Sequence, residues 1–301
     1  MKDIIELRRE IHRHPELSGQ EKETNALVQR ELNRLGIEFK SGYSTYGIVA
    51  QIKGLRPASR TVALRADMDA LAITEDTGLP YASEQKGVMH ACGHDLHTAV
   101  LIGAAELLQM SRSKWAGTVL LVFQPSEEKY GGGADVMLKE KALNAFSPHL
   151  PERMYALHVT PELAVGTLGF RQGQYMASTD EIYITVNGKG GHAALPKETT
   201  NTVLSAAKIL VELQKITSHK QNAVLAFGRV IAEGQTNVIP NSVEMAGTLR
   251  TFDEKFRKEA HIRIAQIAKT VAVAYGAKAK VRIAHGYPVL VNDIAATKKA
   301  R

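Results

Sequence analysis

Residues 61–71, TVALRADMDAL, place an apolar run directly before two acidic residues, Asp67 and Asp69. A short apolar run bounded by polar residues is typical of a buried strand. Similar runs occupy residues 48–52, 118–123 and 154–159, and a helix is predicted over about residues 95–110. Because near-continuous apolar strands alternate with helices, we predict an α/β fold with a doubly wound, mostly parallel sheet covered by helices on both faces.

Two helices precede this region, and each carries an apolar stripe at helical spacing. The stripes are formed by Ile4, Leu7 and Ile11 in the first helix and by Val28, Leu32 and Leu35 in the second. Pro15 ends the first helix and Gly36 closes the second. Ser18 and Glu21 have the spacing of a capping box, so they are expected to begin the second helix.

After about residue 177 the pattern changes to a different order of elements, β-α-β-β-α-β. These elements are predicted over residues 181–186, 201–216, 223–231, 242–251, 254–275 and 278–283. The order is that of the ferredoxin-like split unit. We therefore expect a separate α+β domain over residues 177–287.

Composition limits the classes of function. The 301 residues are 44% hydrophobic and 23% charged, which suits one large or two moderate globular domains. The net charge of +7 permits nucleic-acid binding, but the basic residues are scattered among acidic ones, so no nucleic-acid partner is expected. No apolar run approaches the roughly 18 to 20 residues that cross a bilayer, and the start is a charged amphipathic helix, so we expect a cytoplasmic protein without membrane contact.

Polar residues follow three of the predicted strands and fill one loop. They are Asp67 and Asp69, then Ser126, Glu127 and Glu128, then His158, and the loop residues His90, Cys92, His94, Asp95 and His97. Because strands of an open α/β sheet form ligand sites at their carboxyl ends, these side chains are expected to lie together. Singly, each has an ordinary structural reading; Asp95, for example, would cap its helix.

The joint pattern favours bound metal. Burying several carboxylates together costs heavily unless a cation neutralises them. We therefore expect bound metal, and two ions rather than one. Thiolate, imidazole and carboxylate are normal zinc ligands, and manganese or cobalt would also fit. Two such ions make water more acidic and polarise a carbonyl, which is hydrolytic chemistry. Of the adjacent Glu127 and Glu128, one can hold metal while the other acts as general base.

A rival reading makes Cys92, the only cysteine, a nucleophile. It predicts inactivation by alkylation and survival in chelator. The two histidines around Cys92 and the carboxylate pairs at the same edge argue against it, because a cysteine hydrolase would not need them.

Seven strings occur in an order that resembles a known family: LRADMDAL, MHACGHDLHTA, FQPSEE, ALHV, GKGGHAA, TNVIP and GTLRTF. The chain resembles, from residue 1 to about 293, the metal-dependent amidohydrolases that include hippurate hydrolase, N-acyl-amino-acid deacetylases, N-acetyldiaminopimelate deacetylase and auxin-conjugate hydrolases. These form a branch of the aminoacylase and carboxypeptidase superfamily. The resemblance implies a zinc-peptidase-like catalytic domain that cleaves the amide bond of N-acyl amino acids.

The resemblance also implies residue roles. Two divalent ions (Zn, Mn or Co) would be held by Cys92, His94, Glu128 and His158. Glu127 would be the general base, and Asp69 would orient a ligand imidazole. The wider superfamily has a histidine at the position of Asp67, so Asp67 receives no role.

In this family the second domain is a lid and dimerisation domain, which implies a homodimer. His192, in GKGGHAA, would reach the partner's active site and stabilise the oxyanion. Asn237 and Arg250 would bind substrate, with Arg250 as a clamp for the amino acid carboxylate. The alternatives are a structural salt bridge for Arg250 and an ordinary turn for Asn237.

One departure from the family concerns the end of the chain. Relatives continue past the lid with a Gly-Gly-Glu-Asp-Phe motif and a last metal-binding histidine, whereas this sequence ends at AATKKAR. We therefore expect residues 1–176 to be the first part of the catalytic domain and 288–301 to begin a return to it, with its C-terminal part missing. The rival to an active hydrolase is a non-catalytic remnant that only dimerises. Hippurate, N-acetylcysteine and N-acetyldiaminopimelate are all compatible substrates.

Overall fold

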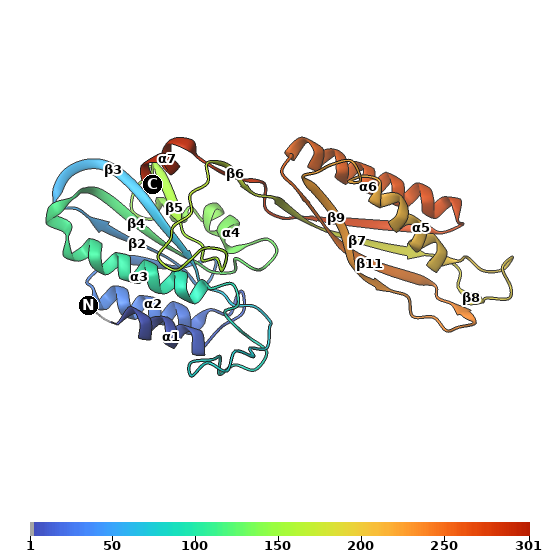
Figure 1. Ribbon diagram of the computed structural model, residues 1–301, viewed down its shortest axis with the longest axis horizontal. Helices are drawn as coiled ribbons and strands as arrows, with labels where there is room; N and C mark the ends of the chain where they lie inside the picture. Colours follow the sequence, from blue (N-terminus) through green and yellow to red (C-terminus); the bar gives the residue numbers. More distant parts are fainter. Residues whose placement is uncertain (1–2) are drawn as a thin grey trace. The chain divides into compact units, whose positions relative to one another are not determined.

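The structure is a computed structural model that describes residues 3–301. Its internal contacts divide the chain into two compact units, Met1–Thr167 and Leu168–Arg301 (Figure 1). Within residues 3–301, no helix is long and apolar enough to cross a membrane.

The first unit is built on a five-stranded sheet in the order β1-β2-β4-β3-β5. The strands are β1 (Glu38–Tyr43), β2 (Gly47–Lys53), β3 (Arg56–Asp67), β4 (Ala116–Gln124) and β5 (Arg153–Ala156). β3 is parallel to β4 and β5, whereas β2 is antiparallel to β1 and β4. The predicted α/β class is confirmed, but the prediction of a mostly parallel sheet is wrong, because two of the four strand pairs are antiparallel.

A tight hairpin accounts for one of the two antiparallel pairs, β1–β2. β1, which the sequence patterns did not predict, is joined to β2 by residues 44–46, and Ser44 and Thr45 turn the chain with φ angles of 46° and 72°. A parallel pair needs a crossover of about a dozen residues or more, so such a short connection forces antiparallel pairing.

Helices cover both faces of this sheet, as predicted (Figure 1). α1 (Ile4–Arg13), α2 (Lys22–Arg34) and α3 (His94–Met110) pack on one face around fully buried side chains such as Leu32, Ile102 and Phe123. The other face is covered by α4 (Gly133–Lys139) and the short 3-10 helix η2 (Ala142–Asn144), which bury Val122 and Met137. A second 3-10 helix, η1 (Arg112–Lys114), precedes β4.

The helix starts differ from one prediction and from one structural alternative. α2 begins after Glu21, whose side chain makes no capping hydrogen bond, so the predicted capping box is wrong. Ser18 instead donates to Asp69 Oδ2 at 2.6 Å, and Glu21 accepts the backbone N–H of Ser126 at 2.7 Å. α3 begins after Gly93, so Asp95 does not cap it. The partners of Ser18 and Glu21 are too distant in sequence for a local capping pattern to reveal.

The second unit contains a four-stranded antiparallel sheet in the order β12-β7-β11-β9. Its main elements are β7 (Ser178–Asn187), α5 (Thr202–Gln214), β9 (Ala223–Ile231), β11 (Ser242–Thr251), α6 (Glu254–Ala274) and β12 (Lys278–His285). This is the predicted β-α-β-β-α-β order. α5 and α6 pack on one face of the sheet and bury residues such as Ile184, Ile209 and Ile264 (Figure 1).

Smaller elements complete the second unit. They are β6 (Gly173–Met176) paired with β13 (Leu290–Asn292), β8 (Gly191–His192) paired with β10 (Val238–Ile239), and α7 (Ile294–Ala300). All of these short elements lay outside the predictions.

Candidate metal centre

The polar residues of the first unit meet at the carboxyl ends of the parallel strands. β3 ends at Asp67, β4 ends at Gln124 immediately before the Ser126 turn, and β5 ends at Ala156. His158 therefore lies in the loop after β5 rather than on the strand, which was predicted to extend further. The crossover from β3 through α3 to β4 brings His94 to the same edge.

His94, the first residue of α3, lies at the centre of this group. Its Nδ1 is 2.9 Å from the backbone oxygen of Asp69, so Nδ1 donates and Nε2 is the ring atom left to bind a proton or a metal ion. Nε2 is buried and has no hydrogen-bond partner within residues 3–301. It lies 3.6 Å from Asp67 Oδ2 and 3.8 Å from Glu128 Oε1. A buried ring nitrogen beside two carboxylates is stabilised by a proton or by a cation, so these atoms fit a metal ion.

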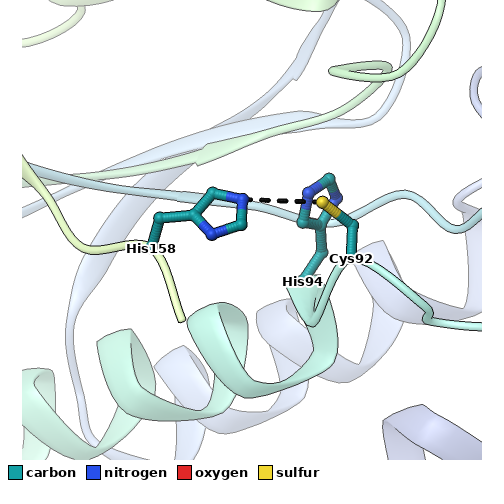
Figure 2. A group of neighbouring side chains, drawn as sticks. All are labelled: Cys92, His94 and His158. Atoms are coloured by element: carbon teal, nitrogen blue, oxygen red, sulfur yellow. Dashed lines mark hydrogen bonds between the residues drawn. The ribbon is translucent and has the colours of Figure 1, made fainter. Parts of the chain in front are cut away.

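Cys92 and His158 converge on the same place (Figure 2). The distance from Cys92 Sγ to His158 Nε2 is 3.5 Å. One donor atom from each of Cys92, His94 and His158 lies within 4.8 Å of the others. Thiolate and two imidazoles at this spacing form a donor set that zinc accepts.

Glu127 and Glu128 follow a sharp turn at Ser126, which has a positive φ of 54°. Donor atoms of His94, Glu127 and Glu128 also lie within 4.8 Å of one another. Burial, and then the neighbouring charge of Glu128, raise the pKa of Glu127. A raised carboxylate pKa brings the group closer to the neutral range in which a general base works best.

Asp69 connects three segments beneath the donors. Its Oδ2 accepts hydrogen bonds from Ser18 Oγ at 2.6 Å and from the backbone N–H of Glu128 at 2.9 Å. Its Oδ1 lies 3.3 Å from His94 Nδ1. Burial opposes ionisation, but the hydrogen bonds from His94 and Ser18 prevail and lower the pKa of Asp69. This carboxylate therefore fixes both the His94 ring and the start of the Glu128 backbone.

His97 is a site residue to which the sequence patterns gave no role. Its Nδ1 lies 2.6 Å from Asp67 Oδ1, and its Nε2 accepts the backbone N–H of Val159 at 3.0 Å. Arg65 donates to the other oxygen of Asp67 at 2.6 Å. Burial raises the pKa of Asp67. The hydrogen bond from His97 and the charge of Arg65 outweigh burial and hold this pKa well below its usual range. The spacing of His94 and His97, three residues apart on a helix, was a signal that they share a face.

The pKa values of the donor residues reflect the negative charge gathered around them. The hydrogen bond with Cys92 raises the pKa of His158 to about 9. Burial opposes protonation of His94, but its bond with Asp69 and the nearby acidic groups raise its pKa to about 11. The same contact with His158 lowers the pKa of the Cys92 thiol. The acidic groups favour positive charge here, and a divalent cation would supply it in place of the protons on the ring nitrogens that face the centre.

The predicted residues of the second unit fall into two places. His192 and Asn237 are adjacent, because β8 pairs with β10 and the backbone N–H of Ala193 donates to the Asn237 carbonyl at 2.9 Å. Arg250 lies near the other end of β11, opposite Thr179 and Val224, and is exposed. Within residues 3–301, no carboxylate lies close enough to Arg250 for an ion pair.

The second unit has another group of metal-type donors, Asp180, His261 and His285. Arg257 binds both carboxylate oxygens of Asp180, at 2.8 and 2.7 Å, and His261 Nε2 lies 2.7 Å from Oδ2. The Asp180 charge is therefore already neutralised. This cluster joins β7 to α6 and has no need of a cation.

An α/β sheet with thiol, imidazole and carboxylate donors around one buried nitrogen is the arrangement of a metal-binding hydrolase. The sequence profile of Peptidase family M20/M25/M40 matches residues 63–301, and the chain belongs to this family.

Individual relatives agree with this assignment. The chain is 40% identical over 304 residues to N-acetyl-L-cysteine deacetylase of Bacillus subtilis (strain 168), covering 100% of this chain and 71% of that protein. It is 36% identical over 294 residues to N-acyl-L-amino acid amidohydrolase of Geobacillus stearothermophilus, covering 96% and 78%. A crystal structure described as a dinuclear metal binding peptidase from M20 family, from Bacillus subtilis, matches with a TM-score of 0.81 and 38% identity over 99% of this chain and 77% of that one. The family resemblance and the hydrolase class predicted from the sequence are confirmed.

Proposed function

We propose that this protein hydrolyses the amide bond of N-acyl amino acids at a centre of two divalent cations, zinc, manganese or cobalt. The observation that carries the proposal is the buried Nε2 of His94, which has no hydrogen-bond partner within residues 3–301 and faces two carboxylates. The substrate class is supported by the names of the relatives, a deacetylase of N-acetyl-L-cysteine and an amidohydrolase of N-acyl-L-amino acids. Family membership favours this enzyme over a non-catalytic remnant.

The proposed ligands are Cys92, His94, Glu128 and His158. When bound, the ions supply Lewis acidity, which polarises the amide carbonyl and makes water more acidic. Asp69 keeps the Nε2 of His94 turned toward the ions, because Asp69 accepts from the Nδ1 side of the ring. Cys92 is proposed as a ligand and not as the nucleophile, since its sulfur shares one donor group with two imidazoles.

Glu127 is the proposed general base. Its carboxylate removes a proton from the attacking water and delivers it to the amide nitrogen as the C–N bond breaks, so that the products are a carboxylate and an amine. The raised pKa of Glu127, caused by burial and by Glu128, suits both transfers.

We also propose that the second unit is a lid and homodimerisation domain. β9 is an edge strand of its sheet, and Val224 and Val230 on this strand are 55% and 51% exposed. An unpaired apolar edge invites a second copy of the chain. The cytoplasmic location inferred from the sequence stays a prediction.

In this dimer His192 is proposed to donate to the developing oxyanion in the partner's site. The Nδ1 of His192 accepts the backbone N–H of Ala194 at 3.1 Å, which leaves Nε2 to carry the proton of the neutral ring. Asn237 beside it and Arg250 at the other end of β11 are proposed to bind substrate, with Arg250 pairing with the amino acid carboxylate.

The test is release of free amino acid from N-acetylcysteine, hippurate and N-acetyldiaminopimelate by zinc-, manganese- or cobalt-loaded protein. Glu127→Gln should lower kcat by about 100- to 10,000-fold without loss of bound metal. Glu128→Gln should lose metal as well as activity. Absence of turnover in folded, metal-loaded protein across the panel would overturn the proposed reaction.

A further inference from the structure

We propose that Glu21 is a positioning residue of the metal centre: its buried carboxylate holds the turn at Ser126 and so places Glu127 and Glu128. The inference rests on the proposed function for the roles of these two acids. Glu21 itself touches none of the proposed ligands, and it acts through the backbone and hydroxyl of Ser126.

Glu21 is unusually placed for a helix-starting residue. It is fully buried, at 0% exposed, although it stands at the first position before α2. Its Oε1 accepts the backbone N–H of Ser126 at 2.7 Å and lies 3.3 Å from Ser126 Oγ. Burying a carboxylate is costly, and a residue needed only for helix capping would keep its side chain at the surface. Its partner Ser126 is 105 residues away in the sequence, so this buried carboxylate joins two distant segments.

The backbone conformation of Ser126 is unfavourable and needs support from its neighbours. Its φ of 54° is in the left-handed region, which disfavours residues with a side chain. Its carbonyl accepts the backbone N–H of Gly133 at 2.9 Å, so the peptide groups on both sides of the turn are tied. Gly133 has no room for a side chain, since a Cβ there would lie 1.9 Å from the Pro125 oxygen. Glu21 and Gly133 thus fix the turn from opposite sides.

The turn decides where the two acids lie. Two residues after Ser126, the backbone N–H of Glu128 donates to Asp69 Oδ2 at 2.9 Å, and Asp69 is held in turn by Ser18 at 2.6 Å. The short segment from Ser18 to Glu21 therefore supports the centre at two points. Without Glu21, Ser126 is expected to relax toward negative φ, which swings both acids away from His94.

The experiment measures zinc affinity without substrate, then kcat and KM, for four variants: Glu21→Ala, Ser126→Gly, Ser126→Thr and Glu21→Ala with Ser126→Gly. Glu21→Ala should weaken zinc binding and lower kcat by about 10- to 100-fold, as is usual for residues that orient ligands. Ser126→Thr should do the same with Glu21 intact, because a β-branched residue resists positive φ. Ser126→Gly adopts positive φ without strain, so in the Glu21→Ala background it should restore at least half of the lost zinc affinity.

Glu31→Ala is the matched control, because Glu31 is a buried carboxylate within α2 that pairs with Arg34 and lies outside the centre. It should lower the unfolding temperature and leave zinc affinity and kcat within about twofold of wild type. Wild-type zinc affinity and kcat in folded Glu21→Ala, or equal losses in the control, would overturn the inference. The inference would also be overturned if Ser126→Gly fails to restore zinc affinity in the Glu21→Ala background. If Glu21→Ala does not fold, the zinc affinity of Ser126→Thr is the measurement that tests the inference. Because the zinc titration needs no turnover, it tests this inference even if the proposed reaction fails.

Discussion

His97 Nδ1 lies 2.6 Å from Asp67 Oδ1, and the other nitrogen of the same ring accepts the backbone N–H of Val159 at 3.0 Å. One imidazole therefore connects the end of β3 to the loop that carries His158. Because Nε2 accepts, the proton of the neutral ring is on Nδ1 and points at Asp67. A residue that holds a metal ligand's loop in this way acts on the metal without touching it.

From this relationship we predict that His97→Ala weakens zinc binding by about 10- to 100-fold, because the loop of His158 loses its anchor and Asp67 loses its donor. Zinc titration monitored by a competing chromophoric chelator measures the change. His149→Ala is the control, since His149 is an exposed histidine of the same unit. Equal zinc affinity in wild type and His97→Ala would show that the loop is held by other contacts.

The single cysteine allows a direct test of its role. If Cys92 is a ligand, bound zinc should slow its reaction with a thiol reagent by at least about tenfold, because the thiolate lone pair is engaged. Activity should disappear in chelator and return when zinc is added back. A thiol that reacts equally fast with and without zinc, in an enzyme that keeps its activity in chelator, would instead identify Cys92 as a nucleophile.

Gly93 separates two proposed ligands and cannot be replaced without strain. Its φ is 86°, and a Cβ at this position would lie 2.4 Å from Val159 Cγ2. We predict that Gly93→Ala destabilises the first unit by about 1–3 kcal/mol and weakens zinc binding. Urea unfolding followed by the fluorescence of Trp115, the only tryptophan, measures the first effect.

A second substitution separates the two causes of this strain. Gly93→Ala combined with Val159→Ala removes the clash but keeps the unfavourable φ, so it should recover part of the stability and not all of it. Full recovery of the stability would mean that the positive φ of residue 93 adds nothing to the destabilisation. No recovery would mean that the contact with Val159 adds nothing to it.

The Asp180 cluster predicts a pH dependence in the second unit. Burial raises the pKa of Asp180, but the bonds from Arg257 and His261 prevail and lower it. The folded-state pKa is thus below the unfolded value of about 3.9, so this contribution to stability is fully present above that pH and is lost as the pH falls through the folded pKa. Asp180→Asn should destabilise the second unit by about 3–5 kcal/mol near neutral pH, because Arg257 is left buried without its partner.

Two optical probes distinguish the units in this experiment. Trp115 reports only on the first unit, whereas far-UV circular dichroism reports on both. Asp180→Asn should shift the dichroism transition and leave the Trp115 transition unchanged, and its stability should depend less on pH below about 4. Glu181→Gln, which alters an exposed neighbour, should change stability by less than about 0.5 kcal/mol. A wild-type pH profile in Asp180→Asn would contradict the assignment.

The sequence predicted those features that depend on local pattern. Apolar runs followed by Asp67, Glu127 and Glu128 predicted strands whose ends carry acids, and helical spacing predicted α3 to within a residue. Features that depend on partners distant in sequence were not predicted. Glu21 matched a local capping pattern, but its hydrogen-bond partner is Ser126. The role of His97 depends on Val159, whose backbone N–H carries no side-chain signature.

The strand directions show the same limit. β2 reads as a buried apolar strand, a pattern compatible with parallel or antiparallel neighbours. The hairpin with Ser44 and Thr45 at positive φ sets the antiparallel β1–β2 pair, and neither residue is a usual marker of that conformation. The roles proposed for His192, Asn237 and Arg250 came from the family resemblance, because no local pattern marks an exposed side chain as substrate-binding.

The most direct test of the metal centre is the metal content of folded protein dialysed against zinc, manganese or cobalt and then freed of excess ion. We predict bound metal in the wild-type protein and its loss in His94→Ala, because His94 shares donor groups with each of the other proposed ligands and its Nε2 is buried. Folded wild-type protein that acquires none of the three ions, or a His94→Ala variant that binds them as tightly as wild type, would contradict the account.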